Sequence, residues 1–168
     1  MLLLKRMLGA LLLDSMTFEE VEADRSANLQ ALFVVLLSAL ATGLGSAADV
    51  WTILLIVVAF VMGWLIWAFM ISWIGTKLLP EPQTESDPGE LLRTLGFAAS
   101  PGILGLAGLI PIVGVYMRWL ASAWMLVAAI IAVRQALDYR STPRAILVCT
   151  IGWFVHIAVL SAITISAS

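Results

Sequence analysis

The chain has 168 residues, of which 62% are hydrophobic and only 12% are charged, and its mean hydropathy is +1.05. A soluble domain carries about twice that charged fraction, and the apolar residues form long blocks, so a bilayer is the expected solvent. The net charge of −2 offers no basic face for phosphates and speaks against nucleic acid as a partner. The single cysteine, Cys149, excludes a disulfide framework within one chain and a cysteine metal site, and we expect no cofactor.

Residues 1–26 are predicted to form an amphipathic and acidic N-terminal segment in the cytoplasm. A helix over residues 1–13 would place Lys5 and Arg6 on one face, and its apolar face would carry Leu4, Leu8, Leu11 and Leu12. That pattern is typical of a short helix lying on the membrane surface, with a frayed terminus as the alternative. In TFEEVEAD, Thr17 and Glu20 have capping-box spacing, so an acidic helix with solvated charges should begin there. Because acidic residues follow the apolar start and no small-residue cleavage site does, we expect the segment to be retained.

Residues 27–168 are predicted to form an all-α polytopic integral membrane bundle. The chain order gives five transmembrane spans, at residues 29–44, 51–79, 91–115, 119–137 and 144–165. The second exceeds the roughly 20 residues needed to cross a bilayer and should tilt or project beyond it. The loop before the third span holds three prolines and four acids, so it should be exposed and irregular.

The third predicted span is broken by proline and is expected to organise the bundle. Pro101 and Pro111 each remove a backbone donor, and in hydrocarbon only neighbouring helices, side chains or trapped water can replace the lost bond. We expect a break before Pro101 and a second change of direction near residues 111–114. Gly102, Gly105 and Gly108 recur every three residues, and small residues at that spacing let helices approach, so these glycines are expected to face another span. Gly96 and Gly114 are further expected structural positions.

The basic residues predict the orientation. With a cytoplasmic N-terminus and an outside C-terminus, only Arg118 lies outside, and the inner segments hold Lys5, Arg6, Arg25, Lys77, Arg93, Arg134, Arg140 and Arg144. Inverting the chain reverses this bias, so the positive-inside rule favours the first arrangement.

Few residues in the spans suggest chemistry. His156, the only histidine, falls in the fifth span on one helical face with Cys149 and Trp153. It could ligate a haem or a chlorophyll-type pigment, although a neutral imidazole in a hydrogen bond between helices is the simpler interpretation. Arg134 and Asp138 have the spacing of an ion pair at the inner end of the fourth span, which indicates a structural role. No nucleophile with an adjacent base and no paired carboxylates occur in a span, so the chain is not expected to be an enzyme.

The sequence resembles the Yip domain family, the Ypt/Rab-GTPase-interacting proteins, in its compact bacterial branch. The resemblance rests mainly on Gly96-Phe97-Ala98 with Pro101, followed by Ile110-Pro111 with Gly114. The runs WMLVAAIIAVRQALDY and TFEEVEAD also resemble that branch. The resemblance implies five helical spans with a cytoplasmic N-terminus. In eukaryotic members it also implies GTPase binding and roles in vesicle traffic, but their DLYGP motif is not found here.

Three functional hypotheses remain open. The first is a non-enzymatic scaffold of the bacterial inner membrane, in contact with lipid, that packs against other integral membrane proteins or against itself. The second is a small transporter or channel that uses the broken third span, because transporters place substrate sites at such breaks. The third is an accessory subunit of a redox or light-harvesting complex with His156 as a ligand. A pull-down in mild detergent, a liposome flux assay and a visible absorption spectrum would separate them.

Overall fold

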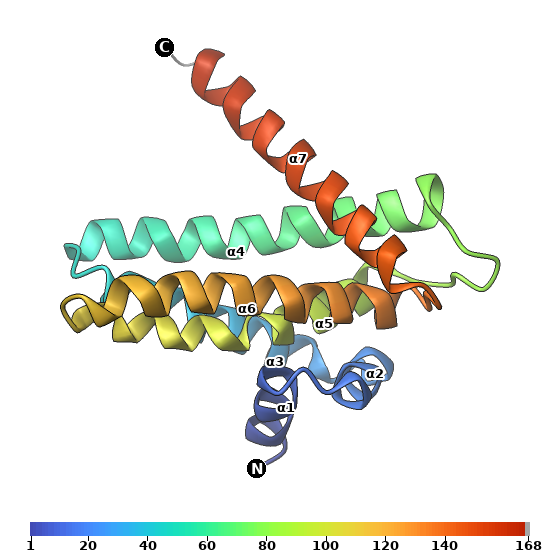
Figure 1. The fold of residues 1–168 in the computed structure, drawn as a ribbon, viewed down its shortest axis with the longest axis horizontal. Coiled ribbons are helices and arrows are strands. Elements are labelled where there is room, and N and C mark those ends of the chain that lie inside the picture. The colour runs from blue at the N-terminus through green and yellow to red at the C-terminus, as the bar shows by residue number, and fades with distance from the viewer. Residues whose placement is uncertain (167–168) are drawn as a thin grey trace.

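A computed structural model describes the backbone of residues 1–166 and the side chains of residues 1–155. Within these residues the chain is helical and contains no strand, as an all-α class predicts. Helices α3 to α6 run side by side, α7 crosses them obliquely, and α1 and α2 lie together against the bundle (Figure 1).

The N-terminal segment consists of α1 (Leu2–Leu11) and α2 (Ser15–Ala23). Helix α2 is capped by Asp14, whose carboxylate accepts hydrogen bonds from the Met16 amide at 3.2 Å and the Thr17 hydroxyl at 2.7 Å. The predicted capping box of Thr17 and Glu20 is therefore wrong. The N-cap lies three residues earlier, at Asp14, because its carboxylate satisfies the exposed donors of the helix.

Helix α1 turns a charged residue toward the protein and its leucines outward, whereas a helix lying on a membrane surface would keep its charged face in water. Arg6 is only 3% exposed, and its guanidinium contacts Glu20 at 3.0 Å, Asp24 at 2.7 Å and the Gln30 side chain at 3.1 Å. Leu4 and Leu8 are exposed. Glu20 and Asp24, whose charges were expected to be solvated, keep 43% and 29% of their side chains exposed and also pair with the buried arginine. Because Arg6 satisfies its charge inside the fold, the leucine face is left free to face lipid.

The first two predicted spans correspond to α3 (Ala27–Gly45) and α4 (Val50–Trp73). Helix α4 starts at Asp49, whose carboxylate accepts from the Trp51 and Thr52 amides at 2.9 and 3.2 Å. It continues into the π-helix η1 (Ile74–Leu78), so the helical run is 29 residues long.

The predicted third span is α5 (Pro88–Ala98) followed by the 3₁₀-helix η2 (Ser100–Leu109). A capping box starts α5, with the Glu90 amide and the Asp87 carboxylate 3.0 Å apart. At Ala99, two residues before Pro101, the backbone changes from α to 3₁₀ geometry and continues, with the Gly102 amide bonded to the Ala99 carbonyl at 2.8 Å. The helix therefore changes type just before Pro101.

The turn after η2 is made by three apolar residues, Ile110 to Ile112. Ile112 has a φ of 67°, in the left-handed region that a β-branched residue rarely adopts. Gly114, which was expected to help make the turn, is already inside α6 (Val113–Ala136) and lies against Gly108. The fourth helix thus begins six residues earlier than the predicted span, because Ile112 takes the conformation expected of a glycine.

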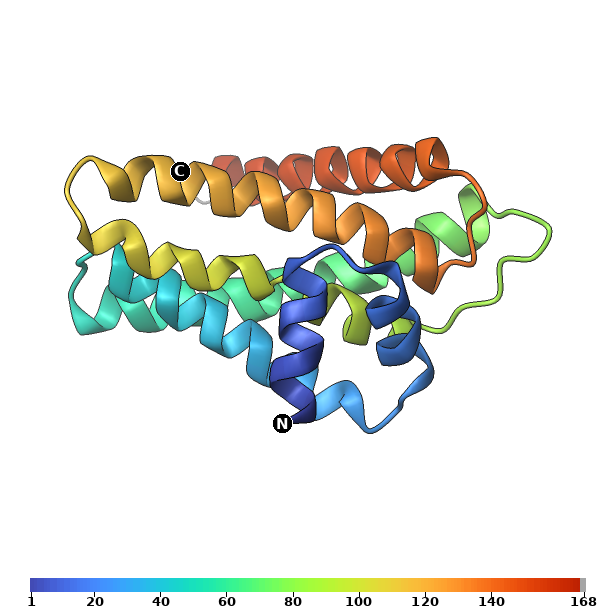
Figure 2. The ribbon, with the colours of Figure 1, turned by 60° about the horizontal axis from the view of Figure 1, so that its bottom comes forward.

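Helix α7 (Thr142–Ser166) covers the predicted fifth span. Four helices are long and apolar enough to cross a membrane, namely Ala27–Gly45, Val50–Leu78, Pro88–Leu109 and Val113–Ala136, and Thr142–Val155 is a shorter apolar helix among the residues searched. In the most apolar window of each run, 67% of Pro88–Leu109 is buried but only 6% of Val50–Leu78. The core therefore surrounds the α5–η2 run, and α4 stands at the edge of the bundle (Figure 1). Figure 2 brings the N-terminal helices α1 and α2 forward, against one side of the bundle.

Candidate functional site

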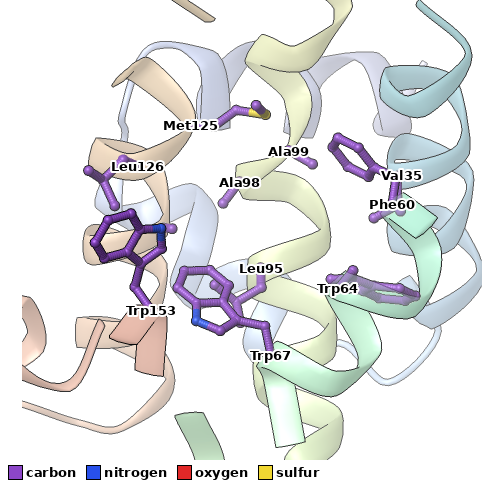
Figure 3. A pocket seen from close by; sticks show the side chains of 12 residues that line it. Val35, Phe60, Trp64, Trp67, Leu95, Ala98, Ala99, Met125, Leu126 and Trp153 are labelled. Atoms are coloured by element: carbon purple, nitrogen blue, oxygen red, sulfur yellow. The ribbon is translucent and has the colours of Figure 1, made fainter. Parts of the chain in front are cut away.

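An apolar groove lies between α4 on one side and α6 and α7 on the other. Its volume is about 290 Å³, and its floor is formed by Leu95, Ala98 and Ala99 at the end of α5. Figure 3 shows side chains from both walls around this floor. The walls are Val35 from α3, Phe60, Gly63, Trp64 and Trp67 from α4, Met125, Leu126 and Ala129 from α6, and Trp153 from α7.

One face of α4 supplies its wall of the groove. Phe60, Gly63, Trp64 and Trp67 are spaced three, four and seven residues from the first, so a single helical face presents all of them. The Trp64 indole is fixed because its Nε1–H donates to the Leu92 carbonyl of α5 at 3.1 Å. The hydrogen bond to Leu92 therefore fixes the Trp64 ring at the groove wall, and Leu92 itself does not line the groove.

Gly63 differs from the other glycines of the described residues. A Cβ built on it would have no neighbour within 4 Å, whereas a Cβ on every other glycine would meet an atom at 3.0 Å or closer. Glycine in a membrane helix is the residue that admits a neighbouring backbone. At Gly63 no described neighbour occupies that position, and Gly63 lines the groove.

The glycines singled out by spacing form a different contact, along α3. The seam between α3 and the α5–η2 run places Gly96 against Ala31, Gly102 against Ser38 and Gly105 against Thr42. At the far end Gly108 lies against the backbone of Gly45. These glycines are thus used inside the chain, and no surface of theirs is left for a partner at those contacts.

A second, polar pocket of about 270 Å³ lies where α2 meets the end of α6. It is lined by Glu19, Glu22, Arg134, Gln135, Asp138, Tyr139 and Arg140. Arg134 and Asp138 both line it, but no ion pair between them is present in the described part of the chain. Helix α6 ends at Ala136 and Asp138 has a φ of 52°, so the helical spacing on which the expected pair depended does not exist.

Tyr139 is a fixed point of this region that sequence patterns did not indicate. Its hydroxyl lies 3.0 Å from the Gly75 carbonyl and 2.7 Å from the Leu79 carbonyl, at the end of the α4–η1 run. Burial raises the pKa of Tyr139 to about 12, so the hydroxyl stays protonated and can donate. A lone tyrosine after a span carries no pattern that would predict this link over 60 residues.

The two prolines and the histidine that the sequence singled out lie in η2, in the turn before α6 and in α7. Pro101 lies at the start of η2 and Pro111 in the turn before α6. His156 belongs to the α7 backbone, but its side chain lies outside the described residues. Among the residues searched, no three His, Cys, Asp or Glu side chains are grouped to hold a metal ion.

Long apolar helices around a buried central run, with an apolar groove at the depth of the spans, define a helical integral membrane protein. Residues 8–163, nearly the whole chain, match the Yip1 domain. The chain therefore belongs to the Yip1 domain family. No curated protein and no solved structure matches it.

Proposed function

We propose that this Yip1-domain protein is a non-enzymatic interaction protein of the bacterial inner membrane. It packs a span of another integral membrane protein, or of a second copy, into the groove beside α4. The observation that carries this proposal is Gly63, an open close-approach position in a groove whose other contacts are apolar or aromatic. A helix seated there would cover the poorly buried face of α4.

The lining of the groove favours a helix over a solute. Among the described side chains that line it, none is charged, and the Trp64 N–H is already bound to Leu92. A polar solute would leave water without gaining hydrogen bonds, which is costly. Small residues on the floor and wall, by contrast, let a helix approach closely enough for packing forces to hold it.

The proposal includes five spans, with α7 as the fifth and the third span bent where α5 becomes η2. It also includes a cytoplasmic N-terminus and an outside C-terminus. This orientation is supported by contacts that bring several basic residues to the same end of the helical bundle. Arg144 donates to the Pro80 carbonyl at 3.0 Å and Gln135 to Glu19 at 3.1 Å, which brings the ends of α4, α6 and α7 next to α2.

The test is Gly63→Leu. Because a Cβ at Gly63 meets nothing within 4 Å, the added side chain has room to extend into the groove. We expect an unchanged melting temperature and loss of the membrane proteins captured with the tagged chain in mild detergent, measured by quantitative mass spectrometry. Tagged and untagged copies expressed together measure self-association in the same way.

The matched control is Met62→Leu, on the same helix at an exposed position that does not line the groove. It should keep every captured partner. Capture by Gly63→Leu equal to that of the parent would contradict the proposal, because a filled groove cannot seat a helix.

A further inference from the structure

Helix α2 is pressed against the membrane domain by two buried apolar side chains, Phe18 and Val21, both fully buried. It packs against α5 and α6. The polar pocket described above opens at the edge of this contact and holds Glu19 and Glu22 from α2 together with Asp138 beyond α6. The apolar contact between α2 and the membrane domain is thus bordered by carboxylates from α2 and from the segment after α6.

The charges around Glu22 are not balanced. The carboxylates that act on it are Glu19 of α2, Glu90 of α5 and Asp138, and Arg93 of α5 is the cation that opposes them. Glu85 and Glu19 act in turn on Asp138. The other titratable or charged side chains that line the pocket are Arg134, Tyr139 and Arg140.

Two of the nearby arginines, Arg93 and Arg134, are bound to carbonyl groups. Arg93 donates through Nε and Nη2 to the main-chain carbonyl of Glu22, at 3.1 and 2.5 Å, and through Nη1 to the Asn28 side chain at 3.4 Å. Arg134 donates to the Tyr139 carbonyl at 3.3 Å. In the described part of the chain no ion pair reaches the carboxylates of Glu22 or Asp138. Both side chains are therefore held near like charges without a paired cation.

Burial, followed by Asp138, Glu90 and Glu19, raises the pKa of Glu22 to about 7, and Arg93 opposes the shift. Burial also raises the pKa of Asp138. A carboxyl group whose pKa is higher in the docked state binds its proton more tightly there. Docking is therefore strongest below the ordinary glutamate pKa and weakens as the pH rises toward about 7.

We propose that the contact between α2 and the membrane domain is a proton-sensitive joint, which is tight when Glu22 carries a proton and loosens when its carboxylate ionises. Asp24, at the end of α2, does not share this range of pH. Hydrogen bonds from Ser26 and Arg6 lower the pKa of Asp24 to about 2, so its ion pair with Arg6 persists. The helices α1 and α2 thus stay linked while the joint opens. The joint is independent of any partner in the groove.

The experiment is hydrogen–deuterium exchange of the full chain in lipid nanodiscs at about pH 5 and about pH 8, corrected for the intrinsic exchange rate. Peptides from α2 report the opening of the joint, and peptides from α6 in the same samples report the membrane domain. One pKa unit corresponds to a tenfold change in an equilibrium. We therefore expect α2 to be at least about tenfold more protected at the lower pH, with no difference in α6.

Glu22→Gln keeps the shape of the side chain and removes its charge, so α2 should be strongly protected at both pH values. Asp138→Asn removes a facing carboxylate and should shrink the difference between them. Asparagine is also suited to the left-handed backbone at that position. Lys5→Gln, a charge change at an exposed site of α1, should leave the difference unchanged. Equal protection of α2 at both pH values in the parent, or a full difference retained in Glu22→Gln, would overturn the proposal.

Discussion

At the residue scale, the Ser100 hydroxyl replaces the hydrogen bond that Pro101 removes, and a second serine, Ser38, bonds the same bend. In a continuous α-helix the Phe97 carbonyl would accept from residue 101, which has no N–H because it is proline. Instead the Ser100 hydroxyl donates to that carbonyl at 2.7 Å. Ser38 of α3 donates, also at 2.7 Å, to the Ala99 carbonyl, which accepts from the Gly102 amide as well. Because no water repairs such groups in hydrocarbon, these hydroxyls allow a proline to lie inside the bundle.

Ser100→Ala should lower the free energy of unfolding by about 1 kcal/mol, since it leaves the Phe97 carbonyl without its hydroxyl donor. Ser38→Ala should cost less, because the Ala99 carbonyl keeps the Gly102 amide at 2.8 Å. Reversible unfolding in mixed micelles measures both. The control is Ser122→Ala, an exposed serine of α6 that bonds a carbonyl of its own helix. Equal values for all three variants would show that the proline site needs no side-chain donor.

At the element scale, the 3₁₀ form of η2 and its glycine spacing explain each other. Runs of 3₁₀-helix beyond three or four residues are uncommon, yet η2 has ten residues. A 3₁₀-helix has three residues per turn, so positions three apart lie directly in line. Gly102, Gly105 and Gly108 have that spacing, and all three lie against α3. The close contact with α3 thus stabilises a backbone form that is weak by itself.

Gly105→Leu should therefore disrupt the seam. A Cβ at Gly105 already meets the backbone of Thr42 at 3.0 Å, so a larger side chain must push α3 and η2 apart. Overpacking of this kind typically costs about 1–3 kcal/mol, which thermal melts in detergent detect as a lower melting temperature. Leu104→Ile, at an exposed neighbour on η2, is the control and should melt like the parent. A parental melting temperature for Gly105→Leu would mean that the seam yields without loss.

At the scale of the whole molecule, the fold gathers most of the basic residues at one end. Arg140 donates its amide to Glu81 at 3.0 Å and Arg144 lies 3.7 Å from the same carboxylate, beside the end of η1. Arg118 lies at the other end, near Gly108. On the positive-inside rule, the proposed orientation has the end beside α2 in the cytoplasm.

The topology can be checked with reporters that are active only in the cytoplasm. A fusion after Ser168 should be silent, because five spans from a cytoplasmic N-terminus bring the C-terminus outside. A fusion in the loop between η1 and α5 should be active, since that loop lies at the end that carries α2. An active fusion after Ser168 would contradict the five-span arrangement.

The sequence by itself determined the helices and the family. Long apolar blocks place the membrane helices within a few residues, apart from the start of α6, because burial in lipid requires such blocks. The spacing of three between glycines predicted a close helix contact, and η2 lies against α3 at those positions. These features are local or periodic in the chain, so composition and spacing are enough to find them.

Only the tertiary structure decided which surfaces are used and which are free. Gly63 looks like the other glycines in the sequence, but it lacks a neighbour because α4 packs along one edge of the bundle. Arg6 looks like a surface charge, but residues 14 to 24 positions away bury it. Glu22 looks solvated until Asp138, more than 100 residues later, is brought beside it. Each of these depends on contacts between distant segments, which no local pattern encodes.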